Sequence, residues 1–178
     1  IGLIFMQDAA IEGFAAVYLQ EALQGGPLLV GGGIAVTHAA VLAGRLLSAR
    51  AVRRFGERSV LTAAGVGAAL GLGLMVMVNS PGGAVLGLLL IGVAVAPVAP
   101  LACSLAGRSA PGRVGQAMSA VSIVAYGAFI VGPILAGSLA DAASLRVALT
   151  PFVVTSFLMA AVAAFGLPRQ ASRSVARE

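Results

Sequence analysis

The sequence contains little charge, no lysine and no tryptophan. Of its 178 residues, 10% are charged and 60% are hydrophobic. Soluble domains have about 25% charged and about 45–50% apolar residues, and a soluble protein as apolar as this one could not cover its surface with polar groups. The composition therefore excludes a soluble globular domain and predicts an integral membrane protein.

Cysteine and histidine are equally scarce, with one residue of each, Cys103 and His38. A single cysteine excludes an internal disulfide bond, and the two residues together are too few for a zinc site. The sequence also contains no P-loop, no HExxH motif and no nucleophile elbow. We therefore expect no metal, no cofactor and no enzymatic activity. An intramembrane hydrolase that pairs His38 with Ser48 or Ser104 is conceivable, but no spacing supports it.

Long apolar segments fill most of the chain. A membrane helix needs roughly 20 mainly apolar residues, because the hydrocarbon core is about 30 Å thick and a helix rises about 1.5 Å per residue. The sequence predicts an all-α membrane protein with a six-span bundle over 1–167 and a basic tail over 168–178. The approximate spans are 1–23, 28–47, 59–79, 83–106, 116–140 and 145–167.

Arginine supplies every basic residue, and its distribution predicts the orientation. Ten of the eleven arginines follow the second, fourth and sixth spans, whereas Arg146 alone lies on the other side. The positive-inside rule therefore places the C-terminus and the opening stretch in the cytoplasm. Arginine without lysine, together with abundant alanine and glycine, suggests a GC-rich bacterial genome, and we expect the bacterial inner membrane. The chain opens on an apolar stretch with no signal peptide, so we interpret it as part of a longer chain.

Five of these arginines lie between 45 and 58, which raises the question of nucleic-acid binding. Such binding requires a basic face on a folded domain, usually with aromatic side chains that stack on bases. Only Phe55 is available here, and no domain surrounds it. The sequence therefore favours a cytoplasmic loop beside lipid head groups and excludes a nucleic-acid partner.

Two acids in the first span are the sharpest chemical feature. Asp8 and Glu12 are four residues apart, so they share one helix face. A charged side chain at mid-membrane usually faces a wet cavity or a partner, and two acids this close would repel each other if both were ionised. We therefore expect one of them to hold a proton. The pair is interpreted as a proton-coupling or substrate-binding site, with a water-facing Glu12 as the structural alternative.

Other polar and helix-bending residues are weaker candidates. His38 lies near the middle of the second span, where it could relay protons or simply pack against a backbone carbonyl. Pro97 and Pro100 predict a bend in the fourth span, and Gly132-Pro133 predicts a flexing point in the fifth. Gln7, Tyr18 and Tyr126 are further candidates for substrate contact.

The segment after the second span carries a sequence pattern beyond the basic residues that a cytoplasmic orientation requires. It reads GRLLSARAVRRFG, and its glycines and arginines are Gly44, Arg45, Arg50, Arg53, Arg54 and Gly56. This resembles the loop motif between the second and third spans of each half of major facilitator superfamily transporters. The first span, with DAAIEGFAAVYLQEAL, is similar to the seventh span of some bacterial members. The fifth, with Tyr126-Gly127 and Gly132-Pro133, resembles their eleventh.

The resemblance implies the C-terminal half of a major facilitator fold, spans seven to twelve, in which the seventh and tenth spans line the central cavity. Asp8 matches a position where an acid is common in the family. Two positions depart from the pattern. The acid expected before Arg50 is Ala49, so this loop lacks the carboxylate that helps bridge helix ends in the family, and the tryptophan common in the seventh span is Phe14.

The expected function is secondary active transport of a small solute by alternating access, as a symporter or antiporter coupled to protons. The expected partners are the lipid bilayer, a small-molecule substrate and the N-terminal half of the same transporter. One half supplies one wall of the cavity, so we expect no transport by this chain alone unless it pairs with another half. The alternative is a non-transporting membrane subunit or relic that acts through helix contacts.

Overall fold

The computed structural model describes residues 2–78 and 80–166, and these residues form an all-helical bundle. The predicted tail over 168–178 lies outside the described residues. Within these described residues, six α-helices and one short π-helix follow each other in sequence. They are α1 (Gly2–Val17), the π-helix η1 (Tyr18–Ala22), α2 (Pro27–Met77), α3 (Pro81–Val95), α4 (Val98–Ser109), α5 (Val114–Ala142) and α6 (Leu145–Gly166).

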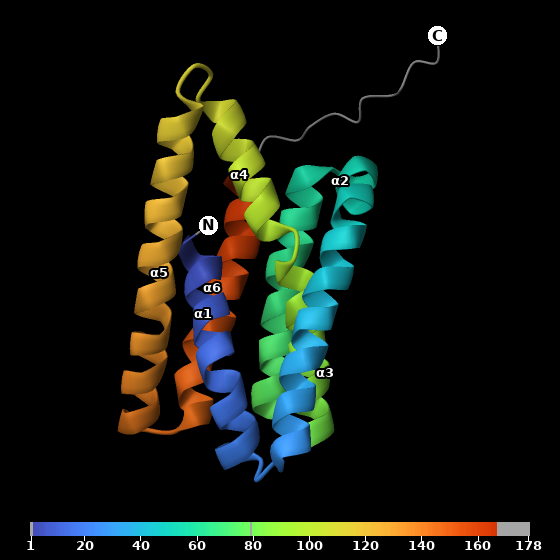
Figure 1. Cartoon of the computed structure of the whole chain (residues 1–178), viewed down its shortest axis with the longest axis vertical. Coiled ribbons are helices and arrows are strands. Elements are labelled where there is room, and N and C mark those ends of the chain that lie inside the picture. The colour runs from blue at the N-terminus through green and yellow to red at the C-terminus, as the bar shows by residue number, and fades with distance from the viewer. Residues whose placement is uncertain (1, 79, 167–178) are drawn as a thin grey trace.

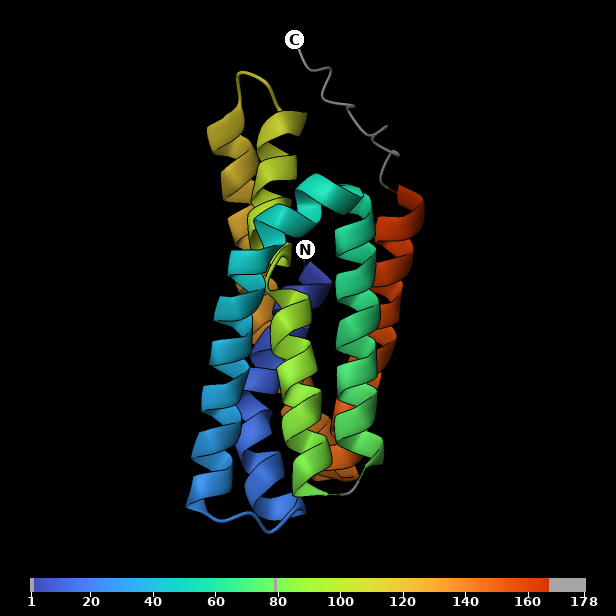
Figure 2. The same cartoon turned by 90° about the vertical axis from the view of Figure 1, so that its right-hand side faces the viewer.

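Helix α2 has 51 residues, more than twice the length that a membrane crossing requires. It is broken at Gly56, whose φ of 78° and ψ of 159° are a combination that essentially only glycine adopts. The chain reverses there, so that the limbs 27–55 and 57–77 run in opposite directions, with the following helix, α3, between them (Figure 2). The segment that we predicted as a loop after residue 47 is thus helical up to this turn, because nothing before Gly56 stops the helix.

The fourth apolar segment is interrupted once, at Ala96 and Pro97, between α3 and α4. Pro97 cannot donate a backbone hydrogen bond, which ends the α3 ladder. Pro100 falls in the first turn of α4, where backbone donors have no helical partner and a proline is tolerated. The helix is therefore interrupted at Pro97, while Pro100 adds no second interruption.

In the part of the chain that the structure describes, five helical stretches are long and apolar enough to cross a membrane, and α2 with its two limbs is one of them. The reversal at Gly56 and the turn between α4 and α5 lie at one end of the bundle (Figures 1 and 2). The turns before α2, α3 and α6 lie at the other end. The arginine-rich segments over 45–58 and 108–113 consequently share one end of the bundle.

Close helix contacts depend on small residues. Gly71 in α2 and Gly87 in α3 face each other so tightly that a Cβ atom built on Gly87 would lie 2.5 Å from the Gly71 carbonyl oxygen. Small residues allow such approach, which stabilises helix pairs where lipid offers no hydrophobic driving force. Helix α2 packs along α3 and α6, and α1 packs along α5. The bundle therefore leaves room between α1 and the first limb of α2.

Candidate functional site

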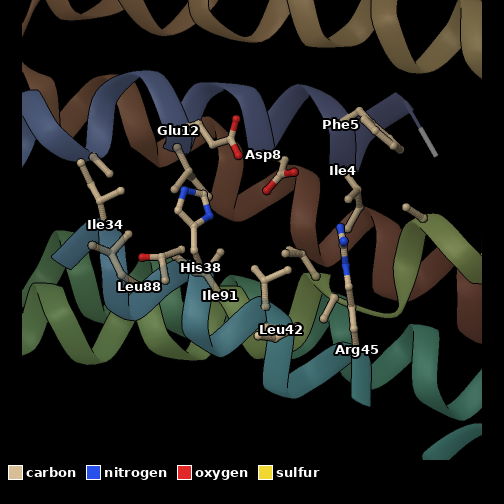
Figure 3. A pocket seen from close by; sticks show the side chains of 18 residues that line it. Ile4, Phe5, Asp8, Glu12, Ile34, His38, Leu42, Arg45, Leu88 and Ile91 are labelled. Atoms are coloured by element: carbon tan, nitrogen blue, oxygen red, sulfur yellow. The ribbon is translucent and has the colours of Figure 1, made fainter. Parts of the chain in front are cut away.

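A cavity of about 510 Å³ occupies that room, between α1, the first limb of α2 and α3 (Figure 3). Ligand sites in proteins typically measure about 300–1,000 Å³ and combine apolar walls with a few polar groups. This cavity has that character. Its walls are mostly apolar, with Ile4, Ile11, Ile34, Leu88, Ile91 and Val95 among the side chains, and four of its residues carry ionisable groups.

Helix α1 contributes the acids. Asp8 and Glu12 both line the cavity, as their spacing on one helix face predicted. Figure 3 shows both carboxylates on the cavity side of α1. Neither forms an ion pair with another residue in the described part of the chain. Because an unpaired charge is costly in the hydrocarbon core, this placement indicates a cavity that holds water or a ligand.

The first limb of α2 supplies the facing wall. His38 projects into the cavity opposite the acids (Figure 3), and its neighbour Thr37 also lines it. The Thr37 hydroxyl donates to the Gly33 carbonyl oxygen over 2.9 Å, so its own lone pairs remain able to accept. His38 is exposed to the cavity rather than packed in the core. The structure thus places a histidine and two acids around one space.

Arg45 also lines this cavity, although its motif predicts a cytoplasmic loop. It is helical and belongs to the first limb of α2. It follows His38 by seven residues, which is two helical turns on the same face. Figure 3 shows its side chain reaching toward Ile4, one turn before Asp8 on α1. The regular spacing of His38, Val41 or Leu42, and Arg45 was the available signal.

Three other candidates lie away from this cavity. Gln7 is completely buried against α6, where its amide is hydrogen-bonded with the Ser156 hydroxyl, and it holds α1 to α6 instead of contacting the cavity. Tyr126 is 72% exposed on α5 and does not line the cavity. Tyr18 is fully buried and donates to a backbone carbonyl. Sequence alone could not distinguish these faces of α1 and α5.

The remaining residues of the loop motif pack helices together, reverse the chain or lie exposed on the surface. A Cβ atom on Gly44 would lie 2.7 Å from the Ala96 Cβ, so this glycine lets α2 approach α3 closely. Gly56 makes the reversal. Arg50, Arg53 and Arg54 are exposed beside that reversal and do not line the cavity. The motif therefore contributes one charged group to the cavity, Arg45.

An ion pair forms near the same end of the bundle, although Ala49 replaces the acid expected in the loop motif. The Arg108 guanidinium at the end of α4 donates to the Glu57 carboxylate, directly after the Gly56 reversal. This pair joins the second limb of α2 to α4.

At the predicted flexing point, Gly132-Pro133, α5 continues without a break, and Gly132 fits against the Met6 carbonyl of α1.

Two curated relatives resemble the chain over most of its length. An uncharacterized transporter of Sinorhizobium fredii is 35% identical over 150 residues, which cover 82% of this chain and 40% of that protein. An uncharacterized MFS-type transporter of Yersinia pestis is 27% identical over 162 residues, which cover 91% of this chain and 41% of that protein. The chain thus spans about two fifths of the length of the curated relatives it matches.

No solved structure matches the chain. The sequence profile of the Major Facilitator Superfamily matches residues 1–178, the whole chain. The all-helical bundle, with its long apolar helices, agrees with half of the fold of that family. Together with the two transporter relatives, the match establishes that the chain belongs to the Major Facilitator Superfamily.

Proposed function

We propose that this chain is the C-terminal half of a secondary transporter that moves a small solute by alternating access. In such transporters two halves rock against each other around a site near the middle of the membrane. The observation that carries the proposal is the cavity between α1, α2 and α3, which gathers Asp8, Glu12 and His38 in an otherwise apolar setting. The chain alone provides one wall, so transport requires a second half.

We further propose that the coupling ion is the proton, in symport or antiport. The support is the pair of acids without ion-pair partners in the described structure, which face a histidine across the cavity (Figure 3). Two carboxylates one turn apart favour the state in which one holds a proton, and a histidine can exchange protons near neutral pH. Proton binding and release at this site would then be linked to the change between inward-facing and outward-facing states.

The proposed location is a bacterial inner membrane, with the C-terminus in the cytoplasm. The shared end of the 45–58 and 108–113 segments supports this orientation, because clustered arginines are retained on the cytoplasmic side. In the alternative interpretation, the chain is a non-transporting subunit or relic that acts through helix contacts, and the cavity binds no solute. Proton-coupled transport predicts that a solute gradient drives proton flux, whereas a non-transporting subunit predicts that it does not.

The experiment uses the full-length protein in proteoliposomes that contain a pH-sensitive dye. Solute gradients of amino acids, organic cations, carboxylates and sugars are imposed in turn, and proton flux is recorded. We expect one class to drive proton flux, and we expect both Asp8→Asn and Glu12→Gln to lower it at least about tenfold, as loss of a proton acceptor does. Asp141→Asn, at an exposed acid outside the cavity, is the matched control and should retain the flux.

Two results would reject these proposals. If no solute class drives proton flux in the full-length protein, proton-coupled transport is wrong and the non-transporting reading is favoured. If flux occurs and both Asp8→Asn and Glu12→Gln retain it at the level of Asp141→Asn, the acid pair is not the coupling site.

A further inference from the structure

The cavity has charges of opposite sign at different levels along its length. Asp8 and Glu12 lie on α1 opposite His38, whereas Arg45 lies two turns beyond His38 and reaches toward Ile4 (Figure 3). Seven residues of helix correspond to about 10 Å along its axis. The cavity therefore has an acidic middle and a basic end.

These opposite charges do not neutralise each other directly. Within the described residues, neither Asp8 nor Glu12 is within salt-bridge distance of Arg45, and the one ion pair found is Glu57–Arg108, outside the cavity. Charges held apart along a mostly apolar cavity keep most of their interaction free energy for a ligand that reaches both. The arrangement is preorganised for a molecule with two charges of its own.

We propose that the substrate is a small zwitterion of amino-acid type with an apolar side chain. Its ammonium group binds Asp8 and Glu12, its carboxylate binds the Arg45 guanidinium, and its side chain packs against Leu88 and Ile91. This assignment rests on the proposed transport function and names the substrate class of the same site. Carboxylate binding suits Arg45, because a guanidinium presents two parallel donors to the two carboxylate oxygens.

Singly charged substrates fit the same groups less well. An organic cation would pair with the acids but would leave the Arg45 guanidinium without a counter-ion in the same cavity. An organic anion would pair with Arg45 and would face two carboxylates. In each case a charged group is desolvated without a partner, which costs more than the new contact returns. A sugar would satisfy neither charge.

The test uses three probes of nearly equal shape and the full-length protein in detergent. The probes are L-leucine, 3-methylbutylamine, which is leucine without its carboxylate, and 4-methylpentanoate, which is leucine without its amine. Apparent affinity is obtained from the rise of the unfolding temperature with ligand concentration. We expect leucine to bind at least about tenfold more tightly than either isostere, because each isostere leaves one cavity charge unpaired.

Variants assign the two ends of the ligand. Arg45→Gln should weaken leucine at least about tenfold and make 3-methylbutylamine bind as well as leucine, whereas Arg45→Lys should keep the preference for leucine. Asp8→Asn combined with Glu12→Gln should remove the preference of leucine over 4-methylpentanoate. Arg50→Gln is the matched control, since Arg50 lies on the same helix and does not line the cavity, and it should leave all three affinities unchanged.

Several outcomes would overturn the assignment. They are equal or tighter binding of 3-methylbutylamine than of leucine by the unaltered protein, the absence of stabilisation by all three probes, and identical effects of Arg45→Gln and Arg50→Gln. The proposed transport function fails separately. Proton flux driven by another solute class would keep transport and reject the zwitterion, whereas the expected binding pattern without proton flux would keep the zwitterion site and reject transport.

Discussion

The Tyr18 hydroxyl donates a hydrogen bond of 2.8 Å to the main-chain carbonyl of Met75. Tyr18 begins the π-helix η1, and Met75 lies near the end of the second limb of α2, so the bond joins two segments that are 57 residues apart. Both residues are almost completely buried. The bond therefore fixes the end of α1 that lies opposite the Gly56 reversal.

Removal of this hydroxyl should lower stability measurably. We expect Tyr18→Phe to decrease the free energy of unfolding by about 0.5–1.5 kcal/mol, the usual net value of a buried hydrogen bond. Thermal unfolding of the purified protein, followed by circular dichroism, measures the change. Tyr126→Phe is the matched control, because Tyr126 is 72% exposed, and it should have no effect. Equal losses for the two variants would contradict the role given to the Tyr18 bond.

The Gly56 reversal provides a test of backbone conformation alone. No atom lies within 4 Å of a Cβ built on Gly56, so alanine fits there by size, but its φ of 78° is strained for any residue other than glycine. We expect Gly56→Ala to decrease the free energy of unfolding by about 1–3 kcal/mol. Gly73→Ala, also in α2 and also with open space, should leave stability unchanged or raise it by up to about 1 kcal/mol. The reverse order would show that the chain does not turn at Gly56.

The Glu57–Arg108 pair should couple the second limb of α2 to α4. The Arg108 side chain is 53% exposed, and such partly exposed pairs contribute about 0.2–1 kcal/mol. A double-mutant cycle with Glu57→Gln and Arg108→Gln isolates this term from other contacts of each residue. We expect a positive coupling that declines as salt is added. Strictly additive effects at low salt would mean that the pair does not contribute.

The helical class and the cavity face of α1 could be predicted, because both follow from local patterns. Long apolar segments require helices in a membrane, and the four-residue spacing of Asp8 and Glu12 fixes their common face. The position of Arg45 was missed because a motif was interpreted as a loop, although nothing in it before Gly56 stops a helix. The burial of Gln7 depends on how α6 packs against α1, and no local pattern encodes that contact.

If the cavity beside His38 is the solute path, a cysteine in it should be accessible from both sides of the membrane. In a full-length protein whose cysteines, including Cys103, are replaced by serine, His38→Cys is exposed to membrane-impermeant thiol reagents from each side in turn. Leu70→Cys, which is 59% exposed on the second limb of α2 where lipid would cover it, is the control. We expect labelling at position 38 from both sides and none at position 70. Labelling of His38→Cys from one side only, or no faster than Leu70→Cys, would contradict alternating access through this cavity.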